Sequence, residues 1–170
     1  MKKIQSRKEW WQHLAKLANC SNETERISEQ VQYFASLGVS DYFHPYNIKK
    51  YAKSIKQAKE KFQSNGFTVE DERSGVKGNA VLHISWTNAT QGIAFTFACI
   101  TRQASKTKEI VNKILTGVEE AATNGEYTYQ YDFADAGIDF VDSIIDNLDK
   151  TGDFSKVELV DNVLILEWRN

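Results

Sequence analysis

Residues 126–133 constrain the fold more than any other stretch, because aromatic and polar residues alternate along them. Tyr127, Tyr129, Tyr131 and Phe133 fall at every second position, which is the period of a β-strand with one aromatic and one polar face. The aromatic face is core if helices cover it and a binding surface if they do not. Several apolar helix stripes elsewhere in the chain need a sheet to cover, so we expect the centre of this face to be buried, with its hydroxyl groups at the rim.

The composition predicts one globular domain with no strong preference for a polyanion. A chain of 170 residues buries about 70% of the surface that its unfolded form exposes, so we expect residues 1–170 to form a single domain. The net charge of −2 favours neither nucleic acid nor a membrane surface as the partner. Cys20 and Cys99 lie far apart and outside any CxxC spacing, so we expect two buried free thiols.

We expect no targeting segment and no membrane span. Polar residues interrupt the basic start of the chain before any apolar core, unlike in a signal peptide. No later run approaches the ~18 apolar residues that a membrane span requires. These features predict a cytoplasmic protein.

Capping patterns predict a helical hairpin at the start of the chain. Ser6 and Asn22 are each followed three residues later by a glutamate, a pattern in which side chains cap the first turn of a helix. The second apolar stripe ends at Gly38, a residue type that favours the position after a helix. We therefore expect two helices in residues 1–38, packed against a larger body.

A longer helix is predicted between Asn47, its cap, and Gly66, its end. Residues 39–46, which contain the only proline, are expected to form an edge strand or a packed loop. Lysines populate the exposed side of the helix, either as a solvated face or as a patch for a polyanion. They are Lys49, Lys50, Lys53, Lys56, Lys59 and Lys61.

Three antiparallel strands are expected to follow this helix, at residues 67–72, 80–86 and 93–100. The third segment is apolar on both faces, which is typical of a central strand. Ser105 can then cap a helix that ends near residues 124–125.

The end of the chain predicts a helix and a hairpin. Asp135 can cap a helix after the tyrosine strand. Residues 156–160 and 163–168 then flank Asp161-Asn162, a pair that a type I′ turn accepts.

Antiparallel strands separated by helices, without regular βαβ alternation, are typical of an α+β domain. We expect residues 39–170 to form a single antiparallel sheet of five to seven strands, with the long helices mainly on one face. The helical hairpin of residues 1–38 precedes it.

Three segments carry a resemblance to a known family. They are Tyr42-Phe43-His44, the sequence Phe-Gln-Ser-Asn-Gly-Phe-Thr-Val at residues 62–69, and Gly125-Glu126-Tyr127. Their layout resembles the ribonuclease E inhibitor family known as regulator of ribonuclease activity B. The resemblance implies a ferredoxin-like α+β domain that binds a ribonuclease and restrains it without catalysis. The family continues with Asp-Gly-Trp after the tyrosine, where this chain has Thr128, Tyr129 and Gln130.

The sequence contains no recognisable catalytic or metal-binding set. His13, His44 and His83 fall on different predicted elements, and none has a second ligand-type side chain at metal-ligand spacing. His44, which lies among aromatic residues, is the best candidate for a functional histidine, with a role in packing as the alternative. Gly75 and Gly78 fit a turn between strands and not a phosphate loop. We predict no metal, no cofactor and no enzymatic activity.

Aspartates recur along one side of the helix that is expected after the tyrosine strand. Asp139, Asp142, Asp146 and Asp149 are spaced three, four and three residues apart, which places them away from the apolar stripe. They form either a solvated acidic face or a surface that docks against a basic partner and speeds its association.

These features favour a non-catalytic protein-binding inhibitor that neutralises a nuclease by occluding its active site, as a toxin-immunity protein or a ribonuclease regulator. Nucleases are basic because they hold phosphate chains, so aspartates would steer such a partner and tyrosines would anchor it. The expected contact residues are Asp139, Asp142, Asp146, Asp149, Tyr127, Tyr129, Tyr131 and His44. The alternative is a nucleic-acid or small-ligand binding module that uses the open face of the sheet and the lysines of the helix between Asn47 and Gly66, and the net charge argues against it.

Overall fold

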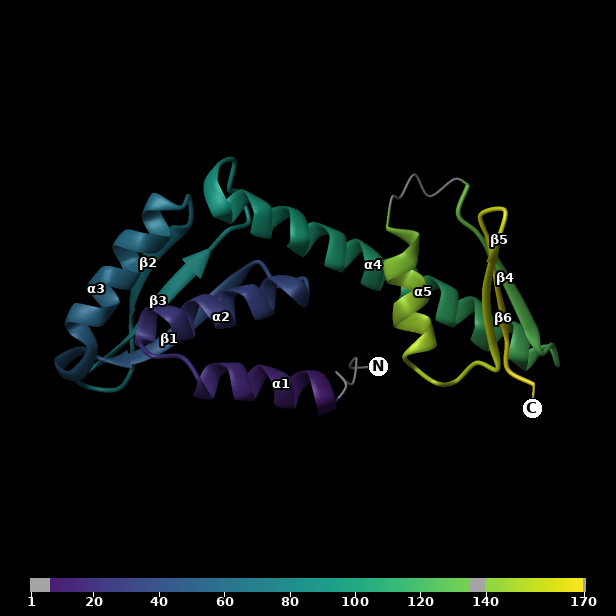
Figure 1. Ribbon diagram of the computed structural model, residues 1–170, viewed down its shortest axis with the longest axis horizontal. Coiled ribbons are helices and arrows are strands. Elements are labelled where there is room, and N and C mark those ends of the chain that lie inside the picture. The colour runs from purple at the N-terminus through teal and green to yellow at the C-terminus, as the bar shows by residue number, and fades with distance from the viewer. Residues whose placement is uncertain (1–6, 135–139, 170) are drawn as a thin grey trace. The chain divides into compact units, whose positions relative to one another are not determined.

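The computed structural model describes residues 7–134 and 140–169. The chain divides into two compact units, Met1–Ala104 and Ser105–Asn170, which are called unit 1 and unit 2 below (Figure 1). The expectation that residues 1–170 form one domain stays a prediction.

Unit 1 begins with helices α1 (Arg7–Ala18), α2 (Glu23–Ser36) and α3 (Ile48–Ser64). The predicted caps of α2 and α3 are confirmed. The side chains of Asn22 and Asn47 each accept a hydrogen bond from the backbone N–H three residues further on, at 2.9 and 3.1 Å.

The strands of unit 1 are β1 (Asp41–Asn47), β2 (Thr68–Arg73) and β3 (Asn79–Ser85). They form an antiparallel sheet in the order β1-β3-β2, called sheet A. One face of sheet A is covered, because the buried side chains of Leu82 and Ile84 pack in one cluster with residues of α2 and α3.

Pro45 lies on β1, so the segment around it is an edge strand, one of the two forms expected from the sequence. The backbone N–H of Trp86 donates to Ser40 O at 3.1 Å. Hydrogen bonds to the neighbouring strand alternate along an antiparallel pair, so the backbone groups of Pro45 point away from β3. Its missing N–H therefore interrupts no ladder bond and leaves this edge less able to pair with another strand.

Trp86 is the largest fully buried side chain of unit 1, with 1% of its surface exposed. Its indole N–H donates to Thr101 Oγ1 at 2.8 Å, and the Thr101 hydroxyl donates in turn to Val39 O at 3.3 Å. A buried indole is thereby satisfied by a buried hydroxyl, as a stable core requires.

Helix α4 (Gly92–Thr123) contradicts two predictions. The strand expected at residues 93–100 is wrong, and so is a helix start at Ser105, since both positions lie inside α4. An all-apolar run fits the period of a strand and the period of a helix equally well. In the structure, Ala94 and Ala98 lie on one buried face of the helix. Their small side chains let the helix approach the core of unit 1, and this packing overrides the strand propensity of the run.

The thiols also differ from the prediction. Cys99 is exposed on α4 and Cys20 is half-buried, so the expectation of two buried thiols is wrong. Cys99 is exposed because residues 93–100 are helical, and the helix places Cys99 away from the buried face that holds Ala98.

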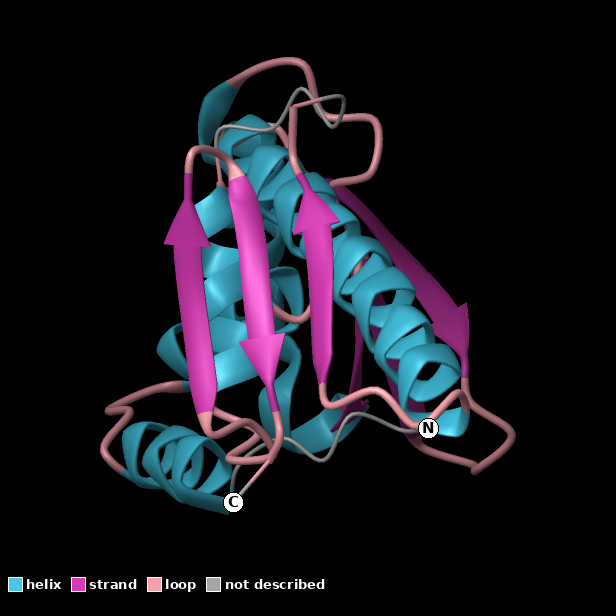
Figure 2. Ribbon diagram, turned by 90° about the vertical axis from the view of Figure 1, so that its right-hand side faces the viewer, coloured by secondary structure: helices cyan, strands magenta, loops and turns pink. Residues whose placement is uncertain are grey.

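Unit 2 contains β4 (Thr128–Asp132), α5 (Val141–Asp149), β5 (Lys156–Val160) and β6 (Val163–Glu167). The strands form a second antiparallel sheet, sheet B, in the order β4-β6-β5 (Figure 2). Its core contains buried residues of α4, α5 and β6, among them Ile114, Ile144, Leu164 and Leu166, so α4 and α5 cover one face of sheet B.

The terminal hairpin is confirmed. Asp161 and Asn162 have φ angles of 48° and 68°, and the two positive values identify the type I′ turn that the sequence predicts. The start of α5 is different from the predicted one: Phe140 is the N-cap residue and makes no side-chain capping bond. The predicted caps Ser6 and Asp135 lie outside the described residues.

The α+β class is confirmed, whereas the prediction of a single sheet of five to seven strands is wrong. The described residues form two three-stranded antiparallel sheets. The physical reason is the helical state of residues 93–100, which removes the strand that was expected at the centre of the sheet. No helix in the described part of the chain combines the length and the apolar character that a membrane crossing requires.

Candidate protein-binding site

The tyrosine strand is β4, and its two faces differ as its alternation predicts. Tyr129 and Tyr131 are half-buried and pack against the core of unit 2, which includes the buried Phe133. The three polar residues of the strand are exposed. The tyrosine face is therefore mainly a packing surface, and its polar face is open to solvent.

Side chains of α4 flank these two tyrosines. Tyr129 lies so close to Gly117 that a Cβ atom at this glycine would collide with its ring and hydroxyl. Lys113 Nζ lies 5.7 Å from the centroid of the Tyr131 ring, within the range of a cation–π contact. Burial raises the pKa of Tyr129, and the negative charge of Glu120 raises it further.

Tyr127 is the most exposed of the three predicted contact tyrosines, with 53% of its surface accessible. It precedes β4, and its carbonyl oxygen accepts the N–H of Trp168 at 3.2 Å. The guanidinium of Arg169 lies 5.2 Å from its ring centroid. Of the three tyrosines, Tyr127 is thus the one whose ring can anchor a partner without rearrangement of the core.

Helix α5 presents the predicted acidic face. Asp142, Asp146 and Asp149 are exposed on it, and the opposite side of the helix is buried in the core of unit 2. The described ion pairs of unit 2 involve other residues, so these three carboxylates are unneutralised by a close cation. Asp139, the fourth predicted member, lies outside the described residues.

This row of charges does not stabilise α5. Asp142 lies in the first turn, where the helix dipole favours a negative charge, but Asp149 lies in the last turn, where it does not. The last turn itself contains no basic residue, and the C-cap residue that follows it is Lys150. Like charges three and four residues apart also repel one another. Helix stability therefore does not explain the row, and its exposure fits both interpretations of the sequence, a solvated acidic face and a surface for a basic partner.

The acidic row and the exposed tyrosine occupy different parts of unit 2. Helix α5 contacts β5, whereas Tyr127 leads into β4. Strands β4 and β5 form the two opposite edges of sheet B. The predicted acidic and aromatic contacts are thus not brought together into one patch.

His44, the last predicted contact residue, is buried on β1 in unit 1. Its Nε2 atom lies 2.9 Å from Glu23 Oε1, and its Nδ1 atom lies 3.2 Å from the Tyr42 hydroxyl. A neutral ring with its proton on Nε2 satisfies both contacts, donating to the carboxylate and accepting from the hydroxyl. Burial lowers the pKa of His44, against the opposing effect of Glu23. Both ring nitrogens have partners within the protein, so these contacts fit the packing role that was the alternative to a functional histidine.

The other two histidines also have structural partners. His13 stacks on Tyr33 with ring centroids 3.8 Å apart, and His83 stacks on Phe43 at 4.2 Å. His83 Nδ1 lies 3.3 Å from a carboxylate oxygen of Glu72. Among the described residues, no group of three or more histidine, cysteine or acidic side chains could hold a metal ion.

Cys20 is a poor nucleophile in its surroundings. Burial raises the pKa of its thiol, and the charges of Glu29 and Glu25 raise it further. The thiol therefore stays protonated at neutral pH, whereas nucleophilic chemistry requires the thiolate.

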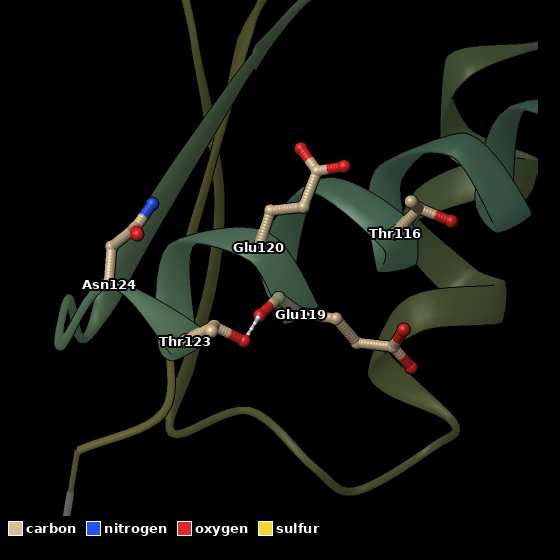
Figure 3. Close-up of a pocket in the computed structure, with 5 residues that line it drawn as sticks. All are labelled: Thr116, Glu119, Glu120, Thr123 and Asn124. Carbon is tan, nitrogen blue, oxygen red and sulfur yellow. Dashed lines mark hydrogen bonds between the residues drawn. The ribbon is translucent and has the colours of Figure 1, made fainter.

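A shallow hollow on α4 in unit 2 adds to the acidic surface (Figure 3). It is lined by Thr116, Glu119, Glu120, Thr123 and Asn124. The Thr123 hydroxyl donates to the backbone oxygen of Glu119 at 2.8 Å, and the side chains of Glu119 and Glu120 are exposed to solvent. The lining contains no histidine, cysteine or basic side chain, so it offers negative charge and not a catalytic set.

Sheet A gives little support to ligand binding on an open sheet face. Phe43 and His83 lie on the face opposite to Leu82 and Ile84, by the alternation of side chains along a strand. Helix α3 packs on the face of Leu82 and Ile84, and its lysines are exposed except for the half-buried Lys59, which pairs with Asp71 of β2. The aromatic pair and the lysines of α3 therefore lie on opposite sides of the sheet.

Charge is divided unequally between the units. Unit 1 has 15 Lys and Arg against nine Asp and Glu, a net charge of +6, whereas unit 2 has six against 14, a net charge of −8. The net charge of the whole chain hides this separation. A count over each half of the sequence would have found this separation, together with the contribution of Glu119 and Glu120, which are not among the predicted contact residues.

A scan against protein families, a search of curated proteins and a search of solved structures found no match to this chain. The resemblance to ribonuclease inhibitors therefore stays an expectation that rests on three short segments.

Proposed function

We propose that this protein is a non-catalytic inhibitor that binds a basic protein partner through unit 2. The observation that carries the proposal is the net charge of −8 on unit 2, together with the exposed, unneutralised row Asp142, Asp146 and Asp149 on α5. Such a surface attracts a basic partner over a distance and raises the rate of productive encounter.

A nuclease fits this surface, because the groove of a nuclease is lined with cations that hold phosphates. A row of carboxylates on a rigid helix offers those cations negative charges in place of phosphates and blocks the groove while it is bound. Steering then comes from α5, and Tyr127 is an anchor for a partner that also reaches the β4 edge. A toxin-immunity protein and a regulator of a cellular ribonuclease would both work in this way.

The experiment begins with capture of the partner from the native host and its identification by mass spectrometry. Association with the purified partner is then measured for the wild type and for the double variant Asp142→Lys and Asp146→Lys. We expect the association rate to fall about tenfold at low salt, and the difference to shrink as salt screens the charges.

A matched control separates local steering from total charge. Glu60→Lys with Glu70→Lys makes the same change in net charge on exposed positions of unit 1, and its effect on the rate should be much smaller. Equal effects of the two double variants, or no effect of the α5 variant, would contradict docking through α5.

The second candidate is nucleic-acid binding by unit 1, favoured by its net charge of +6 and by the exposed lysines of α3. In this case phosphates would bind on α3 and not on an open sheet face. Labelled single-stranded RNA titrated at low salt tests it, with Lys49→Glu and Lys53→Glu as the variant. Absence of binding at low salt removes this candidate, and binding that the variant abolishes supports it.

A further inference from the structure

Helix α1 packs on α2 by one of its faces (Figure 1). His13 is the only buried residue among residues 8–18 of α1. It stacks on Tyr33 of α2, and its Nε2 atom lies 3.4 Å from Gln30 Oε1. The ring of Trp10 lies beside both aromatic rings, with its centroid 5.8 Å from His13 and 6.1 Å from Tyr33. These contacts fix which side of α1 faces α2 and leave its other side to solvent.

The open side of α1 is apolar. Trp10, Trp11 and Leu14 are exposed, and 63% of the surface of Trp11 is accessible. Trp11 and Leu14 are three residues apart and therefore share one side of the helix. Leu37, the C-cap residue of α2, is exposed as well and lies one turn after Tyr33, on the side of α2 that contacts α1. Trp10, Trp11, Leu14 and Leu37 are called the tryptophan face below.

This face differs from an ordinary protein surface. Single exposed apolar residues are normal, whereas a contiguous group of them marks a site of contact. Two of the four side chains are indoles, and an indole combines a large apolar ring with an N–H group that prefers a polar partner. Indoles are therefore favoured where an apolar phase meets water, as at the surface of a lipid bilayer.

The charge around this face indicates which kind of surface it fits. Residues 1–18 contain five basic side chains and one acidic side chain, a net charge of +4, within a unit whose net charge is +6. The net charge of −2 on the whole chain hides this basic segment. A basic helix whose apolar side carries tryptophan and leucine is typical of segments that lie on an anionic membrane. The charged residues are Lys2, Lys3, Arg7, Lys8 and Lys16 against Glu9.

The geometry favours a flat surface over a groove. A protein groove that takes up an amphipathic helix encloses its apolar side, and α2 already occupies one flank of α1. A bilayer surface needs only the outward side of the helix. The aliphatic side chains of Leu14 and Leu37 also fit lipid better than nucleic acid, whose bases stack on aromatic rings.

We propose that unit 1 binds the surface of an anionic lipid bilayer through the tryptophan face, with α1 lying along the interface. Trp11 and Leu14 enter the boundary between the headgroups and the acyl chains. Lys8 is exposed three residues before Trp11, on the same side of α1, and contacts the lipid phosphates. The inference goes beyond the proposed function, which concerns a protein partner of unit 2.

Co-sedimentation of the full chain with lipid vesicles tests the proposal without any protein partner. Binding to vesicles of equal parts phosphatidylglycerol and phosphatidylcholine should be at least about tenfold tighter than to phosphatidylcholine alone, and should weaken as salt screens the charges. Absence of binding to the anionic vesicles at low salt would overturn the proposal. Equal binding to both kinds of vesicle would overturn the anionic surface that it requires.

Two double variants locate the contact on unit 1. Trp11→Ser with Leu14→Ser should weaken binding to the anionic vesicles at least about tenfold, because it removes the apolar side chains that enter the lipid. Both side chains are exposed, so the helix content measured by circular dichroism should stay unchanged. Ile93→Ser with Phe95→Ser removes two exposed apolar side chains of α4 and is the matched control, which should bind as the wild type does. Equal losses in the two variants would contradict binding through α1, as would full binding by the α1 variant.

Tryptophan emission gives a readout that a merely structural role of α1 would not change. Anionic vesicles that contain brominated phosphatidylcholine should shift the emission of the wild type to the blue and quench it, because Trp11 enters the lipid. Trp10→Phe with Trp11→Phe keeps large apolar side chains, so this variant should still bind but lose most of the quenching. Strong quenching that persists in the bound variant would place the contact on another face and refute the assignment.

Labelled single-stranded RNA separates lipid from the other anionic partner of unit 1. The Trp11→Ser and Leu14→Ser variant should bind RNA to the same extent as the wild type, since the tryptophan face contacts lipid and not bases. Loss of RNA binding in this variant, together with absence of binding to the anionic vesicles, would assign the face to nucleic acid and overturn the proposal.

Discussion

Gly117 lies where Tyr129 crosses helix α4, and its lack of a side chain allows this crossing. A Cβ atom here would overlap the tyrosine ring, and the ring cannot retreat because it packs in the core of unit 2. The glycine thus sets how closely β4 approaches α4, although a glycine inside a helix costs about 1 kcal/mol relative to alanine.

Gly117→Ala should therefore destabilise unit 2, by about 1–3 kcal/mol, even though alanine favours the helix. Chemical denaturation followed by circular dichroism measures the change. Asn112→Ala, at an exposed position of the same helix, is the control and should leave stability unchanged or slightly raise it. A Gly117→Ala variant as stable as this control would show that the crossing has room for the added carbon.

His44 should make the stability of unit 1 depend on pH. Its folded-state pKa is lowered by burial, opposed by Glu23 and assisted by Arg26, and the neighbouring Tyr42 has a pKa raised to about 12 and stays neutral. Above its ordinary pKa of about 6.5 the ring is neutral in both states. As the pH falls below that value, the unfolded chain takes up the proton first, so stability declines until the pH has passed the folded-state pKa.

Denaturation profiles collected between about pH 5 and pH 7 should show this loss in the wild type and not in His44→Gln. Glu23→Gln removes the charge that opposes the lowering of the His44 pKa. The stability of this variant should therefore fall more steeply toward low pH than that of the wild type. Parallel profiles for the wild type and His44→Gln would rule out His44 as the source of the pH dependence.

At the scale of single elements, the tight turn of the terminal hairpin is defined by residues with positive φ. Asn162 has a φ of 68°, and asparagine accepts this conformation better than a β-branched residue does. Asn162→Gly should keep or slightly raise stability, whereas Asn162→Ile should lower it by about 1–2 kcal/mol. Equal stability of the two variants in thermal denaturation would mean that the turn changes type to accommodate isoleucine.

Elements with a local signature could be predicted from the sequence. Asn22, Asn47 and the Asp161-Asn162 turn act through bonds or φ angles set within a few residues, so their elements were predicted correctly. Residues 93–100 have no such signature, since isoleucine, phenylalanine and threonine favour a strand while an all-apolar run fits a helix equally well. Contacts of Ala94 and Ala98 with distant parts of unit 1 decide between the two states, and local sequence does not contain them.

The candidate site was predictable to the same extent. The period of 3.6 residues per turn places Asp142, Asp146 and Asp149 on one exposed face, and the structure has them there. Their separation from Tyr127 depends on strand order, because β6 lies between β4 and β5 although it follows both in sequence. Strand order is a property of the whole sheet, so the sequence pattern alone could not supply it.

At the scale of the whole molecule, the division of charge should govern how the protein binds to charged surfaces. A net charge of −2 spread evenly would give weak retention on an anion exchanger and none on a cation exchanger. With +6 on unit 1 and −8 on unit 2, we expect retention on both at low salt and neutral pH.

Charge-reversal variants test which unit binds to each exchanger. Asp142→Lys with Asp146→Lys should lower the salt needed to elute from the anion exchanger, and Lys49→Glu with Lys53→Glu should do so for the cation exchanger. Passage of the wild type through a cation exchanger at low salt would contradict an accessible basic surface on unit 1.

The positions of the tryptophans give each unit its own optical signal. Trp86 is buried in unit 1 with its indole N–H bonded to Thr101, whereas Trp168 is half-buried and is the only tryptophan of unit 2. Trp10 and Trp11 are largely exposed. With both of these replaced by phenylalanine, the blue-shifted emission of Trp86 would report unfolding of unit 1. The emission of Trp168, close to the N-terminal end of β4, would report changes in unit 2, so the two units could be followed separately in one cuvette.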